Sequence, residues 1–328
     1  MTDWLQRLFN RLQAGWTRFQ KSRRGQRVLT GVRWLFTGGV VAYLIYQLTT
    51  IGWVEVGRSL PTTPWFYILL LLMYATLPAT EAVLYGKAWS ISSYDLLPVL
   101  LRKRVLNNDV LGYSGEAYFY LWVKNNLGLA RGRIVETIKD NVIISSVSST
   151  SVAFLLLAVF FLTGQITLLE RFLPDATSTL AGSIAVAIGV IAVGINFRRF
   201  IFSLPSSLLW LFGAGHLTRF VLNNGFQVTQ WAIVIPEVGV GAWITLLALH
   251  IVINQIPFVP ARGLFFLSAS VELSGPLDIP TAAVASMLLA QSLIDRALNL
   301  LTYLGTTAAE VTADEVAEDP ASLPDEIR

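Results

Sequence analysis

The segment INQIPFVPARGLFFLSASVEL, residues 253–273, decides how the rest of the chain is interpreted. It lies between two apolar helical runs, but Pro257, Pro260 and Gly263 interrupt it and Arg262 adds a charge. Proline and glycine disfavour a continuous helix, so the segment is too interrupted to cross a membrane as one helix. It is also too apolar for an external loop. We therefore predict a re-entrant helical hairpin that turns at Pro260 to Gly263.

The composition is typical of an integral membrane protein. Of the 328 residues, 54% are hydrophobic and 14% are charged, whereas a soluble domain has roughly 25% charged residues. About 20 apolar residues span the hydrocarbon core of a bilayer. Six runs approach or exceed that length, at residues 34–51, 65–85, 141–163, 179–195, 205–233 and 281–304. The fold class predicted is an all-α integral membrane protein with about six transmembrane helices.

Several function classes are excluded or disfavoured by the residues that the chain lacks. It has no cysteine and two histidines, which rules out disulfides, thiolate metal sites and thiol nucleophiles and leaves little for zinc. No H-E-x-x-H, G-x-S-x-G or nucleotide-binding glycine motif occurs. We therefore expect no catalytic residue, no metal, no cofactor and no nucleic-acid partner.

The two ends of the chain have opposite charge. Residues 1–30 place leucine, tryptophan and phenylalanine on one helical face and arginines on the other, which predicts an amphipathic helix in the membrane surface. The alternative is a cytosolic helix that packs on the rest of the protein. Residues 306–328 carry seven acids between Glu310 and Glu326 and predict a disordered cytoplasmic tail. A single transmembrane domain, residues 31–305, is expected between them.

Basic residues indicate the orientation of the helices, because positive charge stays in the cytoplasm. The basic N-terminus should therefore be cytoplasmic, and the acidic tail returns to the same side. A second basic group is assigned to a cytoplasmic flank: Lys87, Arg102, Lys103, Arg104, Lys124, Arg131, Arg133 and Lys139.

An internal repeat relates two stretches, residues 64–163 and 205–305. In each, a proline begins a long apolar run that reaches a tryptophan, at Trp89 and Trp231, 142 residues apart. A polar pair follows, Asn107-Asn108 or Asn254-Gln255, and then a segment broken by glycine or proline. Because the first unit enters the membrane from outside and the second from inside, the repeat is predicted to be inverted, a pattern typical of secondary transporters. The second hairpin would be residues 110–122, turning around Gly112 to Gly115.

At these residues the chain resembles the transmembrane region of the lysylphosphatidylglycerol synthase family, polytopic bacterial proteins that include lipid flippase modules. The stretch NNDVLGYSGEAYFYL, residues 107–121, supplies Asn108, Leu111, Gly115 and Glu116 at places that match a family motif. The stretch VETIKD supplies Glu136 and Asp140, and VPARGL with LDIPTAAVASMLLAQSLIDRAL, residues 277–298, is similar to a second motif. The resemblance covers roughly residues 34–305 and implies a lipid flippase of the bacterial inner membrane and cell envelope.

Departures from the family pattern leave the lipid headgroup open. Gly112 stands where the family often has proline, and Ser114 and Phe119 replace arginines that would hold a phosphate. Ala261-Arg262 replaces a glycine pair. No aminoacyl transferase domain is present in the chain.

The candidate site is a set of polar residues at predicted membrane depth, where each ionisable group costs roughly 3 kcal/mol and needs a polar neighbour or a cavity. The cavity-lining candidates of the first half are Glu81, Asn107, Asn108, Asp109, Gly112, Gly115, Glu116 and Asp140. Those of the second half are Arg219, Asn254, Gln255, Pro260, Arg262, Gly263, Glu272, Asp295 and Arg296. Five serines of the third predicted helix are assigned to helix packing: Ser145, Ser146, Ser148, Ser149 and Ser151.

Alternative roles are open for several of these residues. Glu81 and Arg219 either face a cavity or hold helices together as charges. Asp109 lines the cavity or caps a short helix at its N-terminus. Asp295 and Arg296 either pair with each other or contact the pair at residues 254–255.

Three functions compete. A lipid or amphiphile translocase fits the inverted repeat and the two hairpins. A non-catalytic partner or scaffold of a lipid-modifying enzyme would use the basic N-terminal helix and the acidic tail. A membrane enzyme that modifies lipid headgroups has the least support, because no catalytic motif is present. Membrane lipids are the expected partners, and the sequence does not indicate an oligomeric state.

Arg262 provides a direct test, since it is either a phosphate contact or an anchor at the membrane interface. We expect Arg262→Ala to weaken substrate-dependent activity while expression and the thermal unfolding midpoint stay nearly unchanged. A loss of stability that matches the loss of activity would assign Arg262 a structural role instead.

Overall fold

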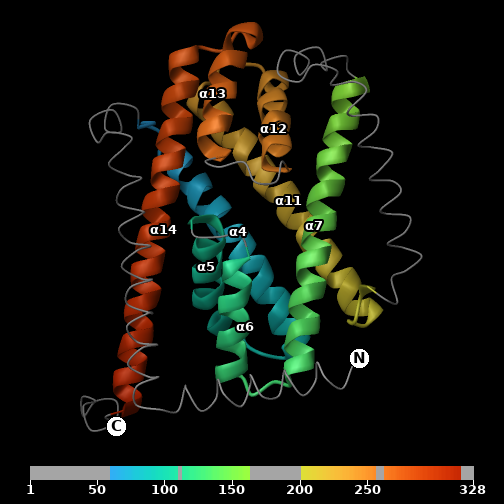
Figure 1. Cartoon of the computed structure of the whole chain (residues 1–328). Helices are drawn as coiled ribbons and strands as arrows, with labels where there is room; N and C mark the ends of the chain where they lie inside the picture. The colour runs from blue at the N-terminus through green and yellow to red at the C-terminus, as the bar shows by residue number, and fades with distance from the viewer. Residues whose placement is uncertain (1–59, 110–112, 163–200, 256–261, 319–328) are drawn as a thin grey trace, which may run out of the picture. The chain divides into compact units, whose positions relative to one another are not determined.

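The computed structural model describes residues 60–109, 113–162, 201–255 and 262–318, all of them within one compact unit, Trp53–Arg328 (Figure 1). Within these ranges the chain is helical and contains no strand, which confirms the all-α class. The predicted helices at residues 34–51 and 179–195, the amphipathic segment 1–30, Gly112 and Pro260 lie outside the described residues.

The described helices fall into two sets of four with the same order of lengths. The first set is α4 (Pro64–Trp89), α5 (Ser93–Asp109), α6 (Ser114–Asn126) and α7 (Arg131–Leu162). The second set is α11 (Ser206–Val234), α12 (Val240–Gln255), α13 (Arg262–Ser274) and α14 (Thr281–Glu318), with a short 3-10 turn, Gly275–Leu277, before α14. Each set has one long helix, two short helices and a second long helix.

Equivalent tryptophans make equivalent contacts in the two sets. Trp89, the last residue of α4, stacks on Phe119 of α6 at 5.8 Å between ring centroids, and its Nε1 donates to Thr137 of α7 at 3.2 Å. Trp231, near the end of α11, stacks on Phe266 of α13 at 6.0 Å. Its Nε1 donates to Gln291 of α14 at 3.4 Å. In both sets the tryptophan therefore joins the first, third and fourth helices.

The two pairs of short helices lie at opposite ends of the described unit. In Figure 1, α5 and α6 occupy the lower half and α12 and α13 the upper half, while α4 and α11 run past each other between them. Each pair sits in its own apolar cluster. Phe66 near the start of α4 belongs to the cluster of the second set, and Phe212 of α11 belongs to the cluster of the first. The long first helices thus interlock the two sets.

Among the described residues, two of the six predicted membrane spans are long and apolar enough to cross a membrane. They are α4 and residues Thr281–Ala308 of α14. Predicted spans 141–163 and 205–233 are also long helices, α7 and α11, but they are more polar. The helix α7 begins at Arg131, ten residues before the predicted start, and its first three turns are charged. The helix α11 carries histidine, arginine, asparagine and glutamine along its length.

Helix boundaries differ from the predictions at two further places. Arg262 and Gly263, predicted to lie in a turn, are the first residues of α13. The helix α14 continues to Glu318, so residues 306–318, predicted as part of the disordered tail, are helical. Alanine and glutamate in this stretch favour a helix even where few apolar residues are available for packing.

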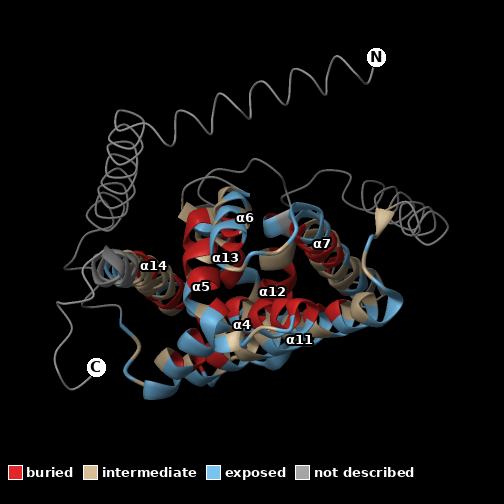
Figure 2. Ribbon diagram, turned by 90° about the horizontal axis from the view of Figure 1, so that it is seen from below, coloured by how far each residue is buried: buried red, intermediate tan, exposed pale blue. Residues whose placement is uncertain are grey.

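Large apolar side chains are exposed along the long helices, while several charged ones are buried. Figure 2 colours much of the outward faces of α4 and α11 as exposed, and Trp210 of α11 is 80% accessible. Glu81, Lys103 and Asp140 are buried. This distribution is the reverse of that in a soluble domain, where charged residues are almost never buried unless paired.

The helices α5 and α6 pack closely at Gly115. Its N–H donates to Asn107 Oδ1 at 2.8 Å, and Ser114 Oγ donates to the carbonyl oxygen of Leu106 at 2.9 Å. A Cβ atom at Gly115 would collide with the carbonyl oxygen of Lys103 and with the Asn107 amide. The close approach of α6 to α5 therefore requires glycine at this position.

This packing predicts that Gly115→Ala lowers the free energy of unfolding by about 1–3 kcal/mol, because the added methyl forces the helices apart. Gly213→Ala in α11 is the matched control, since its Cβ would meet no atom within 4 Å. Alanine there should be neutral or stabilise the helix by up to about 1 kcal/mol. Thermal unfolding of the two variants in detergent makes the comparison. Equal unfolding midpoints for Gly115→Ala and the control would contradict the close approach.

Candidate functional site

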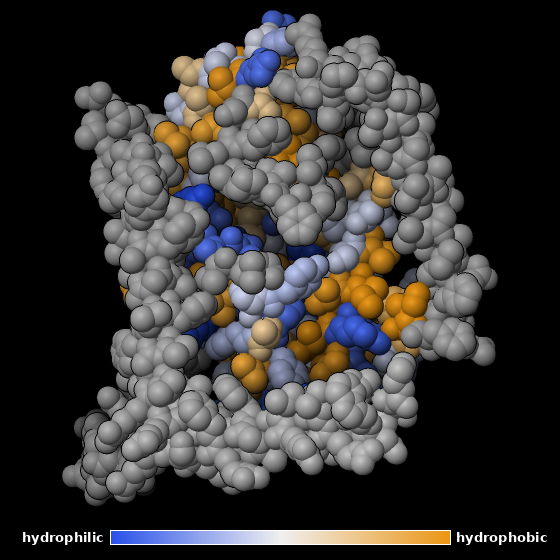
Figure 3. All heavy atoms as spheres, in the orientation of Figure 1, coloured by the Kyte–Doolittle hydropathy of each residue, from blue (hydrophilic) through white to orange (hydrophobic). Residues whose placement is uncertain are grey.

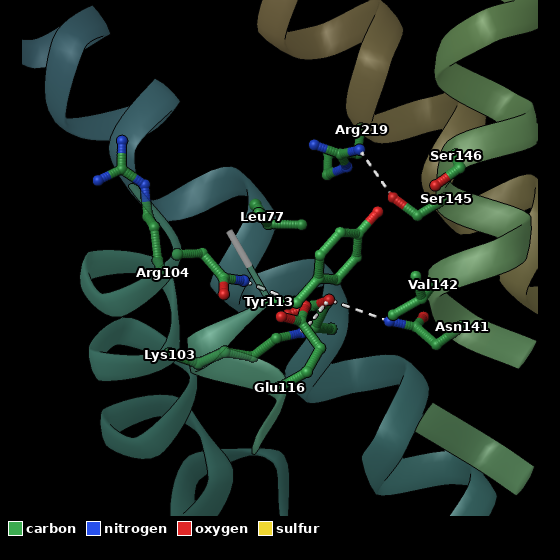
Figure 4. A pocket seen from close by; sticks show the side chains of 12 residues that line it. Leu77, Lys103, Arg104, Tyr113, Glu116, Asn141, Val142, Ser145, Ser146 and Arg219 are labelled. Atoms are coloured by element: carbon green, nitrogen blue, oxygen red, sulfur yellow. Dashed lines mark hydrogen bonds and ion pairs between the residues drawn. The ribbon is translucent and has the colours of Figure 1, made fainter. Parts of the chain in front are cut away.

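A polar cavity of about 190 Å³ lies where α4, α5, α7 and α11 meet the start of α6 (Figure 4). Of its twelve lining residues only Leu77 and Val142 are aliphatic. In Figure 3, hydrophilic residues gather in a hollow near the middle of the molecule, with hydrophobic residues beside them. Ten of the twelve described lining residues carry polar or charged groups, so a polar group placed there would have hydrogen-bonding partners.

Lys103 of α5 lies at the centre of the charges around this cavity. Its side chain is 3% exposed, and its Nζ is 2.7 Å from Glu81 Oε1 of α4 and 3.3 Å from Glu116 Oε1 of α6. The rings of Tyr85 and Phe119 lie within 5.8 Å of the same nitrogen. A buried ammonium needs partners of this kind, because desolvation of an unpaired charge costs several kcal/mol. The lysine thus holds three helices to one another.

Hydrogen bonds extend this network to α7 and α11. Asn141 Nδ2 donates to Glu81 Oε1 at 3.0 Å, and Asn141 Oδ1 lies 2.9 Å from His216 Nε2. The amide oxygen can only accept, so we assign the proton of His216 to Nε2. Asn107 Nδ2 donates to Glu116 Oε1 at 3.1 Å. Side chains from five helices therefore form one connected polar group.

Two charged groups in the cavity retain unused hydrogen-bonding capacity. Within the described residues, Arg219 makes one long hydrogen bond, from Nη2 to Ser145 Oγ at 3.5 Å, and its Nε is buried without an acceptor. Glu116 Oε2 is buried without a donor. Figure 4 shows Arg219 and Glu116 at different ends of the cavity, with the ring of Tyr113 projecting between them.

The formal charges of the inner group cancel. Glu81 and Glu116 supply two negative charges, and Lys103, Arg104 and Arg219 supply three positive charges, of which that of Arg104 is neutralised by Asp295 at 3.0 Å. The cavity can therefore exist without a bound ion, and a ligand with a net charge would disturb the balance.

A second polar cluster joins α5 to α14. Arg104 donates to Asp295 at 3.0 Å and to Asn299 at 2.8 Å, and its guanidinium lies 3.8 Å from the ring centroid of Tyr74. Asp109 lies 3.9 Å from Arg296 and accepts a hydrogen bond from Asn299. Because Arg104 also lines the cavity, this cluster is continuous with its wall.

The second cluster corrects the predicted partners of two residues. Asp295 and Arg296 pair with α5, and neither a mutual pair nor a contact with residues 254–255 is seen among the described side chains. Asp109, the last residue of α5, contacts Arg296 and Asn299 and is not among the described lining residues. These pairs depend on how α14 packs on α5, which the local sequence does not show.

Asp140 has a structural role and does not line the cavity. Its Oδ2 accepts the N–H groups of Ser203 and Leu204, each at 2.8 Å, and Lys139 lies 3.2 Å from its Oδ1. The carboxylate therefore fixes the backbone that leads into α11.

The remaining predicted site residues are not brought to the cavity. Asn108, Asn254, Gly263 and Glu272 are exposed. The side chains of Gln255 and Arg262 lie outside the described part of the structure, as do Gly112 and Pro260. Gly115 shapes the α5–α6 contact, as shown above. Of the predicted set, Glu81, Asn107, Glu116 and Arg219 line the cavity.

Eight of the described cavity residues were missed by the sequence: four had been given another role, and four had been given none, Leu77, Tyr113, Asn141 and Val142. Lys103 and Arg104 were assigned to a cytoplasmic flank, and Ser145 and Ser146 to helix packing, but all four line the cavity. Arg102, also assigned to the flank, is buried with Tyr118 and Tyr303 at about 5 Å from its guanidinium. The signal available in the sequence was a run of three basic residues three positions before the polar pair Asn107-Asn108.

Lys103→Met tests the central ion pair. It leaves the Glu81 carboxylate buried without its cation, and we expect a loss of about 3–5 kcal/mol in the free energy of unfolding. Lys87→Met, at an exposed position of α4, is the control and should change stability little. Adding Glu81→Gln to Lys103→Met should recover part of the loss. Denaturant unfolding of the three variants distinguishes these outcomes, and a Lys103→Met protein as stable as the control would contradict the role of the pair.

Comparison of the chain with protein families, with curated proteins and with solved structures gives no match. Among the described residues, no group of three histidine or acidic side chains is arranged to hold a metal ion. What the cavity binds is therefore argued from its shape, its charges and its unused hydrogen-bonding atoms.

Proposed function

We propose that the protein is a lipid or amphiphile translocase of the bacterial inner membrane. The observation that carries the proposal is the charge-balanced polar cavity enclosed by helices of both repeat units. Translocation of a lipid requires a path for a polar headgroup through hydrocarbon, and a cavity of this kind supplies it. The sequence resemblance to the transmembrane region of the lysylphosphatidylglycerol synthase family, which includes lipid flippases, supports the same proposal.

The distribution of apolar side chains supports a membrane location. Two helices are long and apolar enough to cross a bilayer. Exposed side chains such as Leu71 of α4 and Val221 of α11 would contact lipid tails, while the buried charges would remain inside the protein. In water, an exposed apolar surface of this extent would favour aggregation. With the helices predicted at residues 34–51 and 179–195, α4, α7, α11 and α14 would make six spans.

The two pairs of short helices support alternating access. In the proposed arrangement, α5 with α6 and α12 with α13 are re-entrant hairpins that enter from opposite leaflets. Backbone that is not part of a spanning helix is tolerated at membrane depth only where it is buried in protein or lines a cavity. Inverted repeats with broken helices meet near the midplane in many transporters, and the movement of one unit against the other opens the site to either side.

The cavity volume limits the size of the substrate group that can enter. Pockets for drug-sized ligands have volumes of about 300–1,000 Å³, and the cavity has about 190 Å³. A whole phospholipid does not fit, but a compact headgroup does. The acyl chains would remain in the surrounding lipid during translocation.

Reconstitution into liposomes tests the function. A fluorescent phospholipid placed in one leaflet should reach the other leaflet faster with the protein than in protein-free liposomes, as measured by quenching with a membrane-impermeant reductant. Arg219→Gln should slow the protein-dependent rate about tenfold, the effect of losing roughly one charge-assisted hydrogen bond. Arg131→Gln, at an exposed position of α7, is the matched control and should keep the wild-type rate.

Three results would count against a translocase: no rate above that of empty liposomes, equal rates for Arg219→Gln and wild type, or transport that depends on residues 1–25. The last result would favour the scaffold. A scaffold loses its partner when residues 1–25 are deleted, whereas a translocase keeps its transport rate.

A further inference from the structure

We propose that the cavity binds a zwitterionic headgroup that joins a phosphate to a primary ammonium, with the phosphate at Arg219 and the ammonium at Glu116. This inference rests on the proposed function and names its substrate class. The observations behind it are the two unused hydrogen-bonding groups at different ends of the cavity and the cancellation of the charges around them (Figure 4).

The Arg219 end is suited to a phosphate. A guanidinium has five N–H donors in a planar fork that matches two oxygens of a phosphate. Within the described residues, only the long contact to Ser145 Oγ at 3.5 Å uses one of them, and Nε is buried without an acceptor. Ser145 and Tyr113 add hydroxyl groups to the same region of the wall.

The backbone of Tyr113 supports a role for its side chain in the site. Its φ is 68°, in the left-handed region that residues other than glycine rarely adopt. Such conformations persist where the surrounding structure requires them, and they concentrate at binding sites. Here the conformation begins α6 and directs the tyrosine into the cavity between Arg219 and Glu116 (Figure 4).

The Glu116 end is suited to a primary ammonium. Oε1 of this carboxylate faces Asn107 at 3.1 Å and Lys103 at 3.3 Å, while Oε2 is buried without a donor. A primary ammonium carries three N–H donors and can satisfy Oε2 directly. A quaternary ammonium has no N–H donor and is normally recognised by a cage of aromatic rings, whereas Tyr113 is the only aromatic residue among the described residues that line this cavity.

The balance of charges favours a zwitterion over an anion. Two acids, Glu81 and Glu116, and three bases, Lys103, Arg104 and Arg219, line the cavity. The charge of Arg104 is paired with Asp295 at 3.0 Å, so a zwitterion adds no net charge to a balanced set. An anionic headgroup would satisfy Arg219 but would bring a net negative charge near the buried Glu81 and near Glu116. An uncompensated charge in such a site is strongly unfavourable.

The volume agrees with this assignment. The cavity of about 190 Å³ is smaller than the pockets of about 300–1,000 Å³ that hold drug-sized ligands, and a phosphate linked through two carbons to an ammonium is a correspondingly small group.

Binding to the purified full chain in detergent tests the inference without requiring transport. The probes are short-chain phosphatidylethanolamine, phosphatidylcholine and phosphatidylglycerol, together with free phosphoethanolamine, and the readout is the shift in the thermal unfolding midpoint with probe concentration. We expect the ethanolamine lipid to bind at least tenfold more tightly than the choline and glycerol lipids. Arg219→Gln and Glu116→Gln should each reduce its affinity at least tenfold.

Arg131→Gln and Glu136→Gln, both at exposed positions of α7, are the matched controls and should bind the ethanolamine lipid as the wild type does. Arg219→Lys retains the positive charge and should bind more tightly than Arg219→Gln. If a cavity variant does not fold, the relative affinities of the wild-type protein for the three lipids still test the inference.

The possible outcomes separate this inference from the proposed function. Equal affinity for the ethanolamine and glycerol lipids overturns the zwitterion, and equal affinity for the ethanolamine and choline lipids overturns the ammonium contact. Absence of binding by any probe overturns the inference even if lipid transport is observed. If free phosphoethanolamine binds as tightly as the ethanolamine lipid, the cavity recognises the proposed headgroup. The same result would contradict the proposal that the ligand is a lipid.

Discussion

The burial of one ammonium group between two carboxylates organises the centre of this protein. Lys103 lies on α5, Glu81 on α4 and Glu116 on α6, so the pairing fixes the short helices against a long one. Each ion would be costly alone in an apolar interior, and together they are stable only in a defined geometry. Asn141 and His216 extend the same network to α7 and α11. The cavity exists because these five helices meet around charges that must remain paired.

The two sets of four helices are joined through their long first helices. Each set has an aromatic cluster around its own tryptophan, and each long first helix also contributes a phenylalanine to the cluster of the other set. The sets therefore interlock through α4 and α11. Contacts between α5 and α14, made by Arg104 with Asp295 and by Asp109 with Arg296, add a polar connection between the sets. Polar contacts can exchange partners at lower cost than a packed apolar core, as the movement in the proposed transport would require.

Sequence reasoning predicted the long helices better than the site. Prolines and tryptophans mark α4 and α11, whose observed limits agree with the predicted runs within a few residues. The polar groups at depth were also recognised, and Glu81, Asn107, Glu116 and Arg219 line the cavity. Lys103 was missed because a basic residue beside others indicates a cytoplasmic flank in sequence, whereas only the packing of α5 against α4 reveals that it is buried. The partners of Asp295 and Asp109 depend on a contact between residues about 190 positions apart, which local patterns do not encode.

The central claim is that the two pairs of short helices enter from opposite sides of one membrane, with the polar cavity beside the pair α5 and α6. The chain has no cysteine, so single-cysteine variants can be labelled without background. Asn125→Cys lies at the end of α6 and Gly275→Cys follows α13, both at exposed positions. In sealed vesicles of one orientation, a membrane-impermeant maleimide should label one of them directly and the other only after permeabilisation. Labelling of both from the same side would contradict the account.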